Sequence, residues 1–186
     1  MSLIEIILIG IGLSMDAFAV SICGSMVLAP KDRFKGALRF GLWFGFFQML
    51  MPVLGFFTAG TFYEYIKNYD HWVALLLLLY LGGNMIWESR EGGEPPTQKS
   101  YGFRRMLLLA VATSIDALAV GVSFACLQVD IWQSIGIIGI ITFGFSFFGG
   151  LLGFQLGALV GRRANLVGGL VLVGIGIKVL LEHIAG

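Results

Sequence analysis

Two matching heptapeptides each place one carboxylate inside a long apolar run. Residues 14–20 read SMDAFAV and residues 114–120 read SIDALAV, so Asp16 and Asp116 hold the same place in a motif repeated after one hundred residues. A charge near the middle of a membrane-spanning segment costs about 2.5–3.5 kcal/mol on insertion scales. One such carboxylate can be an accident of packing, whereas two in matching motifs predict a duplicated functional site.

The chemistry that suits two buried carboxylates is the exchange of a cation for protons. When both groups are ionised and close together they repel each other and lose hydration, and a bound cation or a proton relieves these penalties. Hard oxygen ligands favour Mn²⁺, Mg²⁺ and Ca²⁺ over copper and other soft metals. We therefore predict a divalent-cation site with Asp16 and Asp116 as metal ligands. Neutral oxygens along the ion pathway would complete the shell, from Ser14, Ser114, Gln48 and Ser146.

An alternative for the two Asp residues is that each bonds a nearby hydroxyl and holds helices together. We favour the cation site because ionisable groups inside the membrane generally mark functional sites. For Ser14 and Ser114 helix contact is the stronger alternative, since small polar residues commonly serve helix packing in membranes. Cys23 and Cys126 form no CxxC pair and fit buried small apolar residues.

Composition assigns the chain to the membrane proteins. Its 186 residues are 58% hydrophobic and only 12% charged, with a mean hydropathy of +0.90. No basic patch is interleaved with aromatic residues, so nucleic-acid binding has no support. His71 and His183 belong to no catalytic signature, and we therefore predict no enzyme activity and no resident cofactor.

Six apolar runs predict six transmembrane helices, because about 20 apolar residues span a bilayer. They cover residues 3–29, 36–62, 72–87, 106–128, 131–160 and 166–184. A hydrophilic stretch rich in Gly, Pro and charge divides the chain into a first repeat (1–88), a linker (89–105) and a second repeat (106–186). A ridge of small residues in the fifth run, Gly149, Gly153, Gly157 and Gly161, predicts close helix packing inside the bundle.

The basic residues predict the orientation. All Lys and Arg except Lys67 and Lys178 fall in connections that share one side of the membrane if six spans alternate. The positive-inside rule then places the linker in the cytoplasm and both termini outside. Because each repeat holds three spans, the two repeats are inverted relative to each other. Such repeats commonly bind substrate near the midplane, where Asp16 and Asp116 fall.

The sequence also resembles the bacterial manganese efflux pump family (MntP), a six-helix family related to the lysine-exporter superfamily. The resemblance covers essentially the whole chain and is carried by residues 14–19, 70–72, 81–83, 114–121, 127–129 and 168–172. It implies export of Mn²⁺ from the cytoplasm, with Asp16 and Asp116 as the residues that matter most. Two positions depart from the family pattern. Gln48 stands where some members look acidic, and Asn84 stands where a basic residue is common.

Taken together, these patterns predict an all-α polytopic membrane protein made of two inverted three-helix repeats. It is expected to act in the bacterial plasma (inner) membrane as a secondary transporter that exports a divalent cation, with Mn²⁺ as the substrate that the resemblance implies. Its partners would be the lipid bilayer, Mn²⁺ and protons as a coupling ion. Two alternatives stay open, an exporter of a cationic amino acid and a non-transporting structural membrane protein. The oligomeric state is also open.

Overall fold

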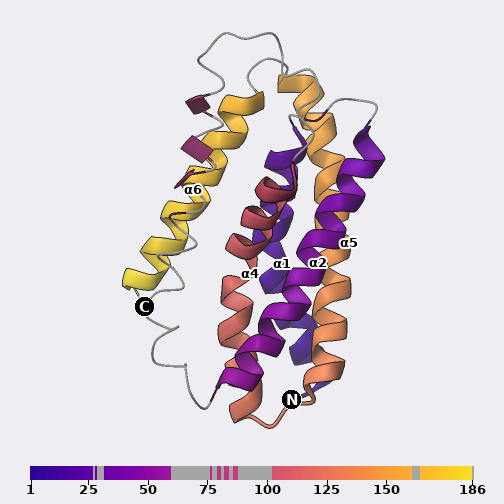
Figure 1. Cartoon of the computed structure of the whole chain (residues 1–186), viewed down its shortest axis with the longest axis vertical. Coiled ribbons are helices and arrows are strands. Elements are labelled where there is room, and N and C mark those ends of the chain that lie inside the picture. The colour runs from indigo at the N-terminus through magenta and orange to yellow at the C-terminus, as the bar shows by residue number, and fades with distance from the viewer. Residues whose placement is uncertain are drawn as a thin grey trace.

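A computed structural model describes residues 1–26, 28, 32–59, 76, 79–80, 82–83, 86–87, 102–160 and 164–185, and this part of the chain is all-helical (Figure 1). Its elements are α1 (Leu3–Ser25), α2 (Arg33–Thr58), α4 (Phe103–Cys126), α5 (Ile131–Val160) and α6 (Ala164–Ala185). The first four include stretches long and apolar enough to cross a membrane, and α6 contains a shorter apolar stretch, Leu166–Ile175. The predicted all-helical class is therefore confirmed.

The predicted count of six spans is confirmed only in part. Four of the predicted runs coincide with the four long apolar helices. The third run, 72–87, lies mostly outside the described residues, although those of its residues that are described are helical. A Cβ added to Gly82 in this run would lie 2.7 Å from the carbonyl oxygen of Gly169 in α6, so the two segments pack closely. The linker lies outside the described residues apart from its last few positions.

Local capping fixes where several helices begin and end. Ser2 and Glu5 form a capping box at the start of α1, because Glu5 N–H donates to Ser2 Oγ and Ser2 N–H donates to Glu5 Oε2. Between α4 and α5, Gln128 takes a left-handed φ of 52°. Val129 N–H then donates to the carbonyl of Phe124, the Schellman pattern. Asp130 caps the start of α5, because its Oδ1 accepts a hydrogen bond of 3.0 Å from the N–H of Trp132.

The described helices run in two opposite directions. Helices α1 and α5 run one way while α2, α4 and α6 run the other, so the start of α1 and the end of α6 point to the same end of the molecule (Figure 1). The main contacts join α1 to α5, α5 to α2 and α2 to α4, and α6 packs against α1. Each corresponding pair of the two predicted repeats, α1 with α4 and α2 with α5, is therefore antiparallel.

Glycines allow the closest helix approaches. Side chains added at Gly149 and Gly153 of α5 would collide with the backbone of α1, at Phe18 and Ile22. One at Gly157 would collide with the backbone of Met26, the residue that follows α1. These three positions confirm the predicted packing ridge, and Gly161 lies outside the described residues. Helices α2 and α4 meet in a similar way, because a Cβ at Gly55 or Gly121 would strike the other helix's backbone.

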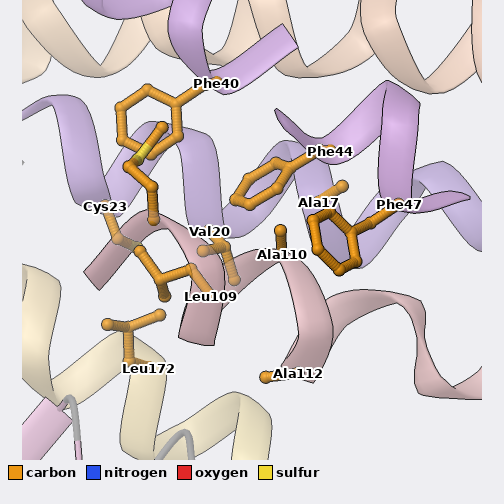
Figure 2. Packing of buried hydrophobic residues seen from close by; sticks show 11 residues of the cluster. Ala17, Val20, Cys23, Phe40, Phe44, Phe47, Leu109, Ala110, Ala112 and Leu172 are labelled. Carbon is orange, nitrogen blue, oxygen red and sulfur yellow. The ribbon is translucent and has the colours of Figure 1, made fainter. Parts of the chain in front are cut away.

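Two apolar clusters fill the bundle, one toward each end. The first apolar cluster joins the C-terminal half of α1 to the N-terminal halves of α2 and α4 and to α6 (Figure 2). Its residues are Ala17, Val20, Cys23, Phe40, Phe44, Phe47, Met106, Leu109, Ala110, Ala112 and Leu172. The second apolar cluster joins the N-terminal halves of α1 and α5 to the C-terminal half of α4. Its residues are Ile6, Leu13, Ala117, Phe124, Val129, Ile131, Ile135 and Ile138.

Candidate functional site

A layer of buried polar side chains separates the two apolar clusters. On α1 and α4 the polar residues lie between residues of the two clusters. On α2 they come directly after the last residue of the first cluster. On α5 they come after the last residue of the second cluster. We call this set the polar layer: Ser14, Gln48, Thr113, Ser114, Thr142 and Ser146, each at most 4% exposed. It holds all four neutral residues predicted for the ion pathway.

Ser14 links α1 to α5 within the polar layer. Its hydroxyl lies 3.0 Å from Thr142 Oγ1 and also donates to the carbonyl of Gly10 one turn earlier. Asp16 is partly buried, and it lies about 200° around the helix from Ser14 because each residue turns the helix by about 100°. The motif therefore presents its hydroxyl to α5 and its carboxylate to a different side of α1.

Gln48 reaches from α2 to α1. Its Nε2 donates to the carbonyl of Leu13 at 3.4 Å, next to Ser14 in the chain. Its Oε1 is buried and accepts no hydrogen bond from the described part of the chain. Pro52 lies four residues later within the same helix. Because proline has no N–H, the backbone carbonyl of Gln48 lacks its usual helical donor.

Ser146 follows Thr142 by one turn of α5 and carries a second unpaired oxygen. Its side chain is fully buried, and its Oγ has no hydrogen-bond partner among the residues that the structure describes. A buried polar atom without a partner costs about 1–3 kcal/mol. Gln48 and Ser146 thus place two such oxygens on two helices that pack against each other.

Several hydrogen bonds in the α4 half of the predicted site are made within that helix. Ser114 donates to the carbonyl of Ala110 at 2.6 Å, and Thr113 donates to that of Leu109 at 3.0 Å. Asp116 is partly buried, and its Oδ1 accepts a hydrogen bond of 2.8 Å from the N–H of Ala117. Ser114 therefore belongs to the polar layer but donates its hydroxyl proton within its own helix.

The structure therefore brings Ser14 together with Thr142 of α5 and Gln48 to the Leu13 carbonyl beside Ser14, and it places the motif carboxylates on antiparallel helices. In the regions with described side chains, no three His, Cys, Asp or Glu residues lie close enough to hold a metal ion. A cation site built from Asp16 and Asp116 thus needs neutral oxygens as well. The assignment of these two carboxylates as metal ligands stays a prediction.

Sequence reasoning missed Thr142 and Thr113. Thr142 stands one turn before Ser146 in a helix of thirty residues that is otherwise almost wholly apolar. Two hydroxyls at positions i and i+4 lie on one face of a helix. That spacing was the available signal, and it is stronger than either hydroxyl alone.

Comparison with known proteins gives a consistent result. Residues 31–180 match a family model described as "Putative manganese efflux pump". The chain is 48% identical over 185 residues to a protein of Mannheimia succiniciproducens named "Putative manganese efflux pump MntP", with 98% of each chain covered. It is also 48% identical to a protein of that name from Ruminiclostridium cellulolyticum, covering 98% of this chain and 97% of the relative. No solved structure matches.

Proposed function

This chain belongs to the manganese efflux pump family, and we propose that it is a secondary transporter that exports Mn²⁺ from the cytoplasm across the plasma membrane. The observation that carries the proposal is the repeated carboxylate motif. Asp16 and Asp116 lie on two antiparallel helices, each next to the boundary between two apolar clusters. Two carboxylates with an apolar cluster toward each end of the bundle suit a site that opens to one side of the membrane at a time.

The proposal includes two inverted repeats, and the helix contacts support it. Aligning Gly55 with Gly153 relates α2 to α5 by ninety-eight positions. Under that relation Gly41 corresponds to Gly139, and Gly45 corresponds to Phe143. Gly41 packs on Phe143 while Gly45 packs on Gly139 and on Phe143. Exchanging corresponding residues converts the contact of Gly41 with Phe143 into that of Gly45 with Gly139. The contact of Gly45 with Phe143 is converted into itself, as expected for contacts around a twofold axis.

The proposed orientation follows from the charged ends of the helices. Arg33 and Lys35 in α2, together with Arg104 and Arg105 in α4, lie in the first turns of helices that begin at the same end of the bundle (Figure 1). The positive-inside rule makes that end cytoplasmic and places both termini outside. Protons are the coupling ion that a carboxylate pair favours, since a proton and a cation compete for the same oxygens.

The test is to replace each carboxylate with its neutral isostere. Asp16→Asn and Asp116→Asn keep size and hydrogen-bonding capacity, and Asn is cheaper than Asp to insert in a membrane. We expect both proteins to accumulate normally yet fail to lower cellular manganese in a host that lacks its own exporter. The double variant should be no worse than either single one, as expected of groups acting as a unit. Asp130→Asn, an exposed Asp at a helix end, is the matched control.

Full protection by both single variants at matched expression would contradict the cation site and favour carboxylates that hold helices together. Measuring lysine and arginine efflux from the same cells separates the amino-acid exporter from the metal exporter. If the Asp variants lose amino-acid efflux while cellular manganese is unchanged, the amino-acid exporter would be favoured.

A further inference from the structure

We propose that Gln48, Thr142 and Ser146 form a neutral-oxygen half-site in the polar layer, which contacts the dehydrated divalent cation on its path across the bundle. The inference rests on the proposed function, and it adds Thr142 as a binding residue. It also assigns ion contact to the interface between α2 and α5 rather than to the motif helices alone.

The unpaired oxygens point to a ligand. Gln48 and Ser146 are fully buried, and their Oε1 and Oγ atoms have no protein partner within the described residues. Buried polar atoms are nearly always paired, so two unpaired oxygens in one layer point to an ion or a water between the helices. Carbonyl and hydroxyl oxygens are hard ligands, and they suit a hard divalent cation such as Mn²⁺.

Pro52 adds to the oxygen supply at the same place. Pro52 has no N–H to donate to the Gln48 carbonyl, so Gln48 offers both a side-chain and a main-chain oxygen. Helices interrupted at membrane depth commonly use such released carbonyls to coordinate cations. The neighbouring glycines bring α2 and α5 close together, since Gly45 of α2 packs directly on Gly139 of α5.

The half-site breaks the apparent twofold symmetry. The alignment that pairs Gln48 with Ser146 pairs Thr142 with Phe44. On α2 the next turn toward the first apolar cluster is therefore the buried ring of Phe44. On α5 the next turn toward the second cluster is the hydroxyl of Thr142, held by Ser14 at 3.0 Å. The polar layer thus extends one turn further toward the second cluster, which is the exit side in the proposed orientation.

The test measures Mn²⁺ binding to the purified full chain in detergent by titration calorimetry, and transport in proteoliposomes. Thr142→Val keeps the shape but removes the oxygen, whereas Thr142→Ser retains it. Ser146→Ala and Gln48→Met remove the two unpaired oxygens. We expect Kd for Mn²⁺ to rise about tenfold for Ser146→Ala and Gln48→Met. It should rise several-fold for Thr142→Val and stay near the wild-type value for Thr142→Ser.

The control is Ser21→Ala, because Ser21 is a buried serine whose hydroxyl donates to the Ala17 carbonyl outside the polar layer. It should bind Mn²⁺ like the wild type. Unchanged Kd in Ser146→Ala, Gln48→Met and Thr142→Val, with binding lost in Asp16→Asn, would show that these oxygens hold only water. That result overturns the half-site and leaves the proposed function standing. A wild-type protein that neither binds nor transports Mn²⁺ overturns both.

Discussion

The glycines of α5 allow a matched test of the packing that holds α1 in place. A Cβ at Gly153 would collide with the carbonyl oxygen of Ile22 and with Ser25 Oγ, whereas one at Gly144 meets no atom of the described residues within 4 Å. Both positions are in the interior of the same helix. Replacing either with Ala gains the same helix propensity, about 0.8–1.0 kcal/mol.

The difference between the two variants therefore isolates the collision. Overpacking a well-filled interface typically costs about 1–3 kcal/mol. At Gly153 most of this should be realised, because the opposing atoms include backbone and Ser25 Oγ is already committed to the Ser21 carbonyl at 2.7 Å. We expect Gly144→Ala to be more stable than the wild type by up to about 1 kcal/mol. Gly153→Ala should be less stable than Gly144→Ala by about 1–3 kcal/mol.

The assay is unfolding of the purified protein in mild detergent, followed by tryptophan fluorescence during a denaturant titration and by thermal melting. The fraction that elutes as a single species in size exclusion serves as a second readout. Equal stability of Gly153→Ala and Gly144→Ala would refute the argument, because it would mean that α1 and α5 are not in close backbone contact at Ile22.

Three further outcomes are expected. Asp130→Ala should lower the free energy of unfolding by about 1 kcal/mol in denaturant titrations, since the side chain caps α5, and Asp130→Asn should lose much less. Gln128→Gly should raise it by up to about 1 kcal/mol in the same assay, because φ is 52° and glycine takes this region without steric cost. In a cysteine-free background, a Cys at Asn68 should react with impermeant thiol reagents on intact cells while one at Gln98 should not. The reverse labelling pattern would contradict the orientation.

The sequence predicted the long helices well but could not separate their buried faces from their exposed ones. Helix α5 begins and ends at the predicted residues, 131 and 160, because an apolar run between charged connections has little choice but to be helical. Along α2, however, Phe44 is 1% exposed and Phe46 is 59% exposed. Both are Phe, so hydropathy gives them the same value. Either face of the helix can hold a Phe, because lipid tails are as apolar as a protein core.

Four of the six residues of the polar layer were predicted from the sequence, but their arrangement was not. The repeated motif located Asp16 and Asp116, and Gln48 could be noticed as an amide inside an apolar run. Which hydroxyl meets Ser14 depends on the angle and register at which α5 crosses α1. The ridge that includes Gly149 and Gly153 predicted close packing, but the local pattern did not indicate that α1 is the helix packed against it. The spacing of Thr142 and Ser146 could have indicated a polar face on this helix, but not the contact of Thr142 with Ser14.

Charge balance explains why an exporter of this kind would carry its carboxylate in two copies. A divalent cation held by one carboxylate keeps a net charge of one, and a net charge between two apolar clusters is costly. Two carboxylates neutralise the bound ion completely, and two protons neutralise the same pair when the ion has left. Under the proposed exchange, the loaded and returning forms of the site are then both uncharged, so neither carries a net charge between the two apolar clusters. With Asp16 alone, one of the two forms would carry a charge, and exchange would stop at that step.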